Sequence, residues 1–427
     1  MEARGSTGGK AIYALRPVET IFVPHPTYGK ALVLRDTEGL TAEQVTIPGP
    51  LVPIVARFDG RHTPERIARE VSAILGEEIP ELLVQQIAEK LDHAYFLESP
   101  RGVERRRIVT HAFRQAPIRA AEHAGGAYPG ERDDLRAFLE QDCFERARSH
   151  RRSSVPPPLD GKKRELVALV APHIDPYRGA VGYGRAYGAL ADSLPDSADT
   201  FVLVGTSHAP MEEPFALTRK GFDTPLGLLE CDHGAVDFLA KRARFDAFGG
   251  ELNHKREHSI EFQAVLLKHV LTERRKNHEK ARIIPILASL GEAQSSGREP
   301  EGDGFFDALA ELAHARRNSL VFIIGADLAH VGPRFGDRFP LDEAGRAALE
   351  ETDRASLAHA LAQDASRFWE HVQGDLDQRR VCGLAPIYTL LRSLTRQAEG
   401  RLVHYEQNVD PQEGSIVSFA SAAYYTR

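Results

Sequence analysis

Apolar runs separated by helical segments dominate the last two-thirds of the chain. The runs have no polar side, which is typical of strands covered on both faces of a parallel sheet. They lie at residues 166–170, 201–204, 283–287 and 320–324. Helical periodicity fills the intervals and continues after the last run, before two strand-like segments at 402–405 and 416–420. This order predicts an α/β fold with a mostly parallel central sheet flanked by helices.

The composition argues against several classes of protein. The chain has 427 residues and a formal net charge of −7, and this mild acidity is unlike a general nucleic-acid surface. Its cysteines, Cys143, Cys231 and Cys382, form no CxxC pair, so we expect a reducing compartment without disulfides. No apolar stretch is long enough for a membrane span, and no secretory signal is evident. We therefore expect a cytoplasmic protein that binds neither nucleic acid nor membrane.

The amino-terminal part is organised differently. The expected divisions are a disordered lead at 1–20, a small winged-helix-like α+β domain at 21–100, a polar connector at 101–121 and the α/β domain at 122–427. Strand-like segments lie between 28 and 56. Thr63 is a helix N-cap with Pro64 at the first helical position, and a second helix is expected at 79–93. A short strand at 95–97 would close this domain.

Histidines follow two of the predicted strands. His173 comes after the run at 166–170 in the segment Ala-Pro-His, and His208 comes after the run at 201–204 in Gly-Thr-Ser-His. Ligands of open α/β sheets bind at the carboxyl ends of strands. Imidazole nitrogens bind Fe(II), Zn(II) and copper, so the pair predicts half of a metal site. Packed or helix-capping side chains are the alternative.

A third group of proton-handling side chains lies in the segment Glu-His-Ser-Ile-Glu. In a helix, Glu257 and Glu261 would share a face, with His258 three residues before Glu261. That spacing would bring an acid–base pair to the pocket. Alternatively, Ser259 caps the helix and the acids stabilise its positive end.

The last two segments supply a carboxylate, a histidine and a thiol. Asp327 and His330 follow the run at 320–324, where the carboxylate could orient an imidazole that moves protons near neutral pH. Cys382 precedes a probable helix, and helix N-termini stabilise thiolates. A metal-bound or reactive thiol is one interpretation, and a small buried side chain is the other.

The order of these segments resembles the Memo family, which includes AmmeMemoRadiSam system protein B. The similar segments are Ala-Pro-His, Gly-Thr-Ser-His, Thr-Pro-Leu-Gly, Glu-His-Ser-Ile-Glu, Ile-Ile-Pro-Ile, Asp-Leu-Ala-His and Cys-Gly. The likeness starts at Ala124 and covers about 300 residues. It implies a fold related to class III extradiol dioxygenases and a metal pocket of His173, His208 and Cys382.

Some features depart from that pattern. Ile174 follows the first histidine where relatives commonly have alanine, and Ala209 stands where they often have a second histidine. True extradiol dioxygenases bind Fe(II) through two histidines and a carboxylate, so a cysteine as third ligand argues against catechol ring cleavage. Residues 21–100 resemble the small peptide chaperone of pyrroloquinoline quinone biosynthesis.

The resemblance implies a metal-binding protein with Fe(II) as the expected ion and copper or zinc as alternatives. We expect His258 and His330 to handle protons, with Asp327 and Glu261 orienting them. The expected activity is a redox or oxygen-dependent reaction, of the non-haem oxidoreductase kind, on a small aromatic or peptide-derived substrate. A non-catalytic peptide-binding scaffold and a zinc-dependent hydrolase are the alternatives. The family name suggests an AMMECR1-like protein and a radical SAM enzyme as partners.

Overall fold

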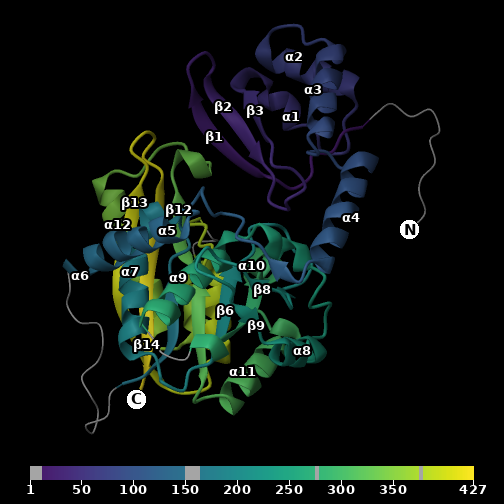
Figure 1. Ribbon diagram of the computed structural model, residues 1–427. Helices are drawn as coiled ribbons and strands as arrows, with labels where there is room; N and C mark the ends of the chain where they lie inside the picture. The colour runs from purple at the N-terminus through teal and green to yellow at the C-terminus, as the bar shows by residue number, and fades with distance from the viewer. Residues whose placement is uncertain (1–11, 150–163, 275–277, 375–377) are drawn as a thin grey trace. The chain divides into compact units, whose positions relative to one another are not determined.

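A computed structural model describes residues 12–149, 164–274, 278–374 and 378–427 (Figure 1). The chain divides after Gln115 into two compact units, each with its own hydrophobic core. None of the helices in these described ranges is long and apolar enough to cross a membrane. Residues 1–11 of the predicted disordered lead lie outside the described residues.

The first unit contains an antiparallel sheet, in the order β1–β2–β3, and several helices. Its elements are β1 (Glu19–His25), β2 (Gly29–Arg35), β3 (Gln44–Pro48), α1 (Val52–Val55), α2 (Pro64–Leu75), α3 (Glu81–His93) and α4 (Pro100–Gln115). The start of α2 is confirmed, because the Thr63 hydroxyl accepts a hydrogen bond from the backbone N–H of Arg66 at 3.3 Å. The winged-helix-like architecture and the peptide-chaperone likeness stay predictions.

The ordered structure of the first unit begins earlier in the chain than the composition predicts. Ala14 and Leu15, inside the predicted disordered lead, form β-bridges with the body of the unit. The guanidinium of Arg16 is buried and lies 2.8 Å from the Asp36 carboxylate. The prediction of disorder is therefore wrong for residues 14–20, because backbone pairing and a buried ion pair hold them.

Two further local predictions for this unit are wrong. Residues 52–55 form helix α1 within a segment predicted to be strand-like, because Pro53 cannot donate to a strand ladder but fits the first turn of a helix. The predicted connector at 101–121 is mostly helix α4. Val109 and Phe113 lie one turn apart on α4 and are buried, which gives this polar segment an apolar face.

The second unit is an α/β structure around one large sheet (Figure 1). Its strands are β5 (Leu166–Ala171), β6 (Thr200–Thr206), β7 (Phe215–Leu217), β9 (Glu230–Cys231), β10 (Arg282–Ala288), β11 (Leu320–Gly325), β12 (Asp327–Val331), β13 (Ala398–Val409) and β14 (Ile416–Thr426). A separate pair is formed by β4 (Ile118–Arg119) and β8 (Gly221–Phe222). The helices include α5 (Arg132–Phe138), α6 (Arg146–Ser149), α7 (Pro176–Ser193), α8 (His233–Arg242), α9 (His258–Arg274), α10 (Gly291–Ser296), α11 (Phe305–Ala315), α12 (Glu343–Leu361), α13 (Ala365–Gln373) and α14 (Leu384–Ser393). The predicted strands of this unit are confirmed, and helices occupy the intervals between them as expected. Asp175 caps the start of α7, where its side chain accepts the backbone N–H of Arg178.

The sheet is mixed rather than mostly parallel, which corrects the prediction. Its order is β12–β14–β5–β11–β6–β10–β7. The four inner strands β5, β11, β6 and β10 are parallel, whereas β14 and β7 pair antiparallel with the two outer members of that group. The last two strands form an antiparallel hairpin, and its second strand, β14, also pairs antiparallel with β5.

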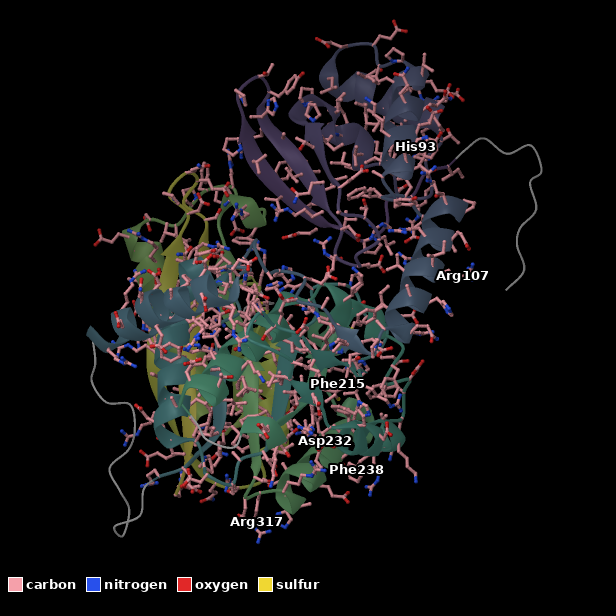
Figure 2. All side chains as sticks on the ribbon, viewed as in Figure 1. His93, Arg107, Phe215, Asp232, Phe238 and Arg317 are labelled. Atoms are coloured by element: carbon pink, nitrogen blue, oxygen red, sulfur yellow. The ribbon has the colours of Figure 1, made fainter. Side chains whose placement is uncertain are left out.

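Helices cover both faces of the inner strands, which explains their apolar sequences. Phe201 and Leu203 of β6 belong to the core shared with α7 and α9. Val202 and Val204 belong to the opposite core, shared with α8, α11 and α14. Phe215, which is labelled in Figure 2, lies in that second core. Its ring stacks on that of Phe305 with ring centroids 4.3 Å apart. Alternating side chains are therefore buried on both faces, as a two-sided layer structure requires.

A glycine allows α7 to approach the segment that joins α5 and α6. That segment, Leu139–Glu145, is a π-helical stretch. A Cβ on Gly184 would lie 1.9 Å from the carbonyl oxygen of Cys143 and 2.9 Å from the Ala147 Cβ. Backbone rather than a flexible side chain blocks the space, so the helices would have to separate to admit a methyl group.

We expect Gly184→Ala to destabilise the second unit by about 2 kcal/mol, because an overpacked core strains its neighbours. The midpoint of thermal unfolding, followed by circular dichroism, measures the change. Gly234→Ala is the matched control, since this helical glycine in α8 is exposed and its nearest atom would be 3.6 Å away. The control should be neutral or slightly stabilising. Equal midpoints for both variants would contradict the packing assigned to Gly184.

Candidate metal centre

Strand ends place two predicted ligands at one edge of the sheet. Gly325 at the end of β11 is level with Ala171 of β5 and Gly205 of β6. Because β11 lies between β5 and β6, His173 and His208 approach each other across its end rather than from adjacent strands. Parallel strands share their carboxyl edge, so the sheet itself brings these two loops together.

Two glycines allow the start of α9 to rest on these strand ends. A Cβ on Gly205 would lie 2.3 Å from Ser259 Oγ, and a Cβ on Gly325 would lie 2.2 Å from the Ser259 carbonyl oxygen. The Ser259 hydroxyl donates to the carbonyl oxygen of Thr206 at 2.8 Å. This close contact carries His258, the first residue of α9, to the other two histidines.

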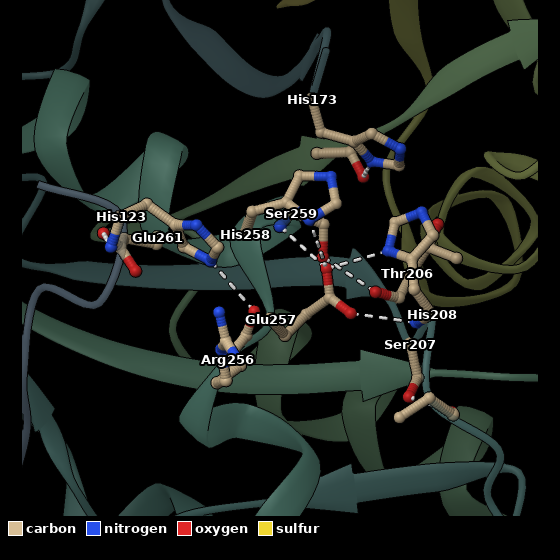
Figure 3. A network of polar contacts seen from close by, with 12 residues as sticks. His123, His173, Thr206, Ser207, His208, Arg256, Glu257, His258, Ser259 and Glu261 are labelled. Atoms are coloured by element: carbon tan, nitrogen blue, oxygen red, sulfur yellow. Dashed lines mark hydrogen bonds and ion pairs between the residues drawn. The ribbon is translucent and has the colours of Figure 1, made fainter. Parts of the chain in front are cut away.

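The imidazoles of His173, His208 and His258 form one cluster. One ring nitrogen from each lies within 4.8 Å of the other two. The ring of His208 is stacked on that of His258 with centroids 4.6 Å apart, and His173 meets both edge-on at 5.1 and 5.4 Å (Figure 3). Three nitrogens at this spacing can converge on one ion at about 2.0–2.2 Å from each. His258 was predicted as a proton handler, and the geometry adds it to the candidate ligands.

His173 is held rigidly at the buried end of the cluster. Its Nδ1 lies 3.0 Å from the carbonyl oxygen of Gly325, and its backbone N–H donates to Asp327 Oδ1 at 2.8 Å. The carbonyl oxygen can only accept, so Nδ1 donates this hydrogen bond and Nε2 is the nitrogen that remains for a metal. The Nε2 atom lies 3.1 Å from the Cys382 sulfur.

His208 is fixed by a carboxylate that the sequence prediction did not include among the site residues. Glu257 Oε1 lies 2.9 Å from His208 Nδ1, and Oε2 accepts the backbone N–H of His208 at 2.8 Å. Glu257 also accepts the backbone N–H of Ser259 at 3.0 Å and lies 3.4 Å from His258 Nδ1 (Figure 3). The prediction put Glu257 on a helical face with Glu261, but α9 begins only at His258.

Charges around the cluster are complementary. Burial disfavours the ionised Glu257 carboxylate, but the His208 ring and its N–H groups outweigh this effect and hold the pKa of Glu257 well below its usual range. Partial burial and the neighbouring His208 hold the pKa of His258 well below its usual range, so this ring is neutral, as a ligand must be.

Cys382 lies at the cluster, as the sequence predicts. Its carbonyl oxygen accepts from the Thr206 hydroxyl at 2.7 Å, and the next backbone N–H, that of Gly383, donates to the Asp327 carbonyl oxygen at 3.0 Å. Burial disfavours the thiolate, but the positive charges of His173 and His330 outweigh this effect and lower the pKa of Cys382 to about 6. The thiol is therefore a candidate ligand beside the imidazoles.

Asp327 and His330 do not form the pair that their spacing suggests. The Asp327 carboxylate is buried and faces His173. His330 instead has its Nδ1 3.2 Å from the Leu328 carbonyl oxygen and its ring edge-on to Phe335. The expected orienting role of Asp327 toward His330 is wrong, because β12 begins at Asp327 and turns the two side chains to different partners.

Glu261 also has other partners than predicted. It is fully buried, and its carboxylate contacts the Arg119 guanidinium and the Tyr128 hydroxyl and accepts the backbone N–H of His123 at 2.9 Å. It therefore orients neither of the two histidines expected to handle protons. These partners lie about 140 residues earlier in the chain, and local sequence spacing gives no signal for such pairs.

The cluster is closed at one end and open at the other. The His173 side chain is 2% exposed, whereas the His208 and His258 side chains are 34% and 32% exposed. An ion held by all three rings would keep positions open on the exposed side. Open positions distinguish catalytic metal sites from closed structural ones.

Comparisons with known proteins identify the family of this chain. A family model described as Memo-like protein matches residues 119–423. A MEMO1 family protein of Aquifex aeolicus (strain VF5) is 26% identical over 420 residues, covering 96% of this chain and 100% of the relative. MEMO1 family protein TTHA0924 of Thermus thermophilus is 28% identical over 366 residues, covering 84% and 98%. A crystal structure of uncharacterized protein JW3007 from Escherichia coli K12 covers 61% of this chain and 99% of its own, with 13% identity and a TM-score of 0.32 that supports no conclusion. The chain belongs to the Memo-like protein family.

Proposed function

We propose that this protein is a metal-dependent redox protein whose metal site consists of His173, His208 and His258, with Cys382 as an adjacent sulfur ligand. The observation that carries the proposal is the convergence of three imidazole nitrogens within 4.8 Å of one another. Fe(II) is the proposed ion, and copper is the alternative, because imidazole with thiolate suits both.

The side chains around the rings support metal binding over a packed histidine cluster. Nδ1 of His173 faces a carbonyl oxygen, and Nδ1 of His208 faces the Glu257 carboxylate. Both partners can only accept a hydrogen bond, so each Nδ1 donates and each Nε2 is the nitrogen left to bind a metal, which would displace any proton that it carries. Metal-binding histidines in proteins are held in this way by an acceptor on the nitrogen that does not bind the metal.

The arrangement favours chemistry over a purely structural role. A metal held here would supply Lewis acidity and one-electron transfer at its open positions. The chain supplies the rest: Glu257 holds His208 in one tautomer, and the Asp327 carboxylate holds the loop of His173. The exposed, stacked rings of His208 and His258 line the open side, where we propose that a small aromatic or peptide-derived substrate binds.

Metal analysis of the full chain purified without oxygen, followed by an oxygen-uptake screen with small aromatic compounds and peptides, tests the proposal. Bound iron or copper with substrate-dependent oxygen uptake is the expected result. Bound zinc without uptake would overturn the redox role in favour of hydrolysis. Protein that binds no metal but still binds peptide would identify a scaffold and overturn the proposal entirely.

Removing single ligands should separate the contribution of each ring and of the sulfur. We expect His173→Ala, His208→Ala and His258→Ala each to weaken metal binding more than about 100-fold. Losing a ligand should cost more than losing a residue that only orients one, which costs about 10- to 100-fold. Cys382→Ser should still bind the ion but lose any sulfur-to-metal absorption. His314→Ala, an exposed histidine on α11, is the control and should bind like the wild type. Equal affinity of His258→Ala and this control would exclude His258 as a ligand.

Glu257→Gln tests the carboxylate that orients His208. An amide can accept one hydrogen bond at this position but lacks the charge, so we expect metal affinity to fall by about 10- to 100-fold. The measurement is a metal titration at a temperature where circular dichroism shows the variant to be folded. An unchanged dissociation constant would mean that His208 is positioned without Glu257.

A further inference from the structure

A buried arginine binds the backbone of the turn that carries Glu257. Arg119, on β4, is fully buried. Its Nε donates to the carbonyl oxygen of His254 at 2.9 Å, and one of its terminal nitrogens donates to the carbonyl oxygen of Glu257 at 3.0 Å. The other terminal nitrogen donates to Ala120 O at 2.8 Å and contacts the Glu261 carboxylate. One side chain thus binds both sides of the turn at 254–257 and the first turn of α9.

Glu261, the carboxylate paired with Arg119, accepts further hydrogen bonds. Besides the guanidinium, the Glu261 carboxylate accepts from the Tyr128 hydroxyl and from the backbone N–H of His123. The Arg119 guanidinium also lies over the Phe222 ring, 5.2 Å from its centroid. Removing two charges from water is costly, and such a pair adds little stability over apolar packing. A pair with this many directed bonds is better suited to fixing a backbone geometry.

Arg119 is connected to the candidate metal ligands through two successive sets of hydrogen bonds. Arg119 binds the backbone on both sides of the turn that presents the Glu257 carboxylate. That carboxylate binds the Nδ1 and the backbone N–H of His208. Through Glu261, the same guanidinium also holds the start of α9, where His258 is the first residue. Two of the three candidate ligands therefore depend on one arginine.

We propose that Arg119 is a positioning residue that sets the metal affinity of the cluster through Glu257, an inference that rests on the proposed metal site. Arginine is required because its planar fork reaches three carbonyl oxygens and a carboxylate together. A lysine ammonium has the same charge but no such fork, so it cannot hold both sides of the turn.

A double-mutant cycle with Co(II) as the probe tests this role. Co(II) affinity and the visible spectrum of the complex are measured for the full-length wild type, Arg119→Lys, Glu257→Gln and the double variant. We expect Arg119→Lys to weaken Co(II) binding by about 10- to 100-fold and to shift the spectrum. In the Glu257→Gln background, the same change should have less than a threefold effect, because residues that act through one contact are not additive.

The control is Arg16→Lys. Arg16 is also buried and paired with acids, at 2.8 Å from Asp36 and 3.0 Å from Glu38, but it belongs to the first compact unit. It should leave Co(II) affinity and spectrum unchanged. A general loss of stability would lower the unfolding temperature of either variant, whereas only a positioning role changes the Co(II) spectrum of folded protein.

The outcomes separate this proposal from the proposed function. A wild type that binds no Co(II) at the three histidines would refute the metal site itself. A wild type that binds, with a folded Arg119→Lys of equal affinity and spectrum, would overturn only the role of Arg119, as would fully additive effects with Glu257→Gln. If Arg119→Lys does not fold, Tyr128→Phe removes one bond to Glu261 and keeps the ring. Its Co(II) affinity should then fall a few-fold, and an unchanged affinity would overturn the proposal.

Discussion

The shared carboxyl edge of β5, β11 and β6 is the constraint on which the site depends. These strands are in register, so the loops that follow them leave the sheet at the same level. Gly205 and Gly325 lack the Cβ atoms that would collide with Ser259, and α9 can therefore start directly above the strand ends. Burial on both faces fixes the strands, and the fixed strands bring His173, His208 and His258 together without any local sequence motif that spans them.

Much of the second unit could be predicted because buried strands and amphipathic helices leave separate periodic signals. The direction and order of the strands leave none. A strand such as β14, with ten of its eleven residues buried, has the same composition whether it runs parallel or antiparallel to β5. The place of β11 between β5 and β6 likewise leaves no signal in the strand sequences. The sequence therefore predicted the layers, but not the mixed sheet.

The site could be predicted where chemistry coincides with a strand end or a helix start. His173, His208 and Cys382 meet that condition, and the structure brings them within contact of one cluster. Arg119 does not meet it, because it lies in a segment whose composition resembles a linker. The carbonyl oxygens of His254 and Glu257 that it binds are more than 130 residues away. Glu257 was misplaced for a smaller reason: one residue decides whether a carboxylate belongs to a helical face or to the turn before it.

The loop of Cys382 is anchored by the same means as the turn of Glu257. Arg379 reaches inward to the buried Asp353 carboxylate at 2.8 Å, and Arg380 reaches the other way to Asp337 at 2.7 Å. Arg380 has a φ of 50°, a conformation that a non-glycine residue keeps only where its surroundings hold it. Arginines thus hold both the loop that carries Cys382 and the turn that carries Glu257, while about a third of each of the His208 and His258 side chains is exposed. Residues that are held firmly on the buried side keep the donor atoms in place, and the exposed side lets a ligand exchange. A reactive metal centre needs both properties, whereas a structural one does not need the second.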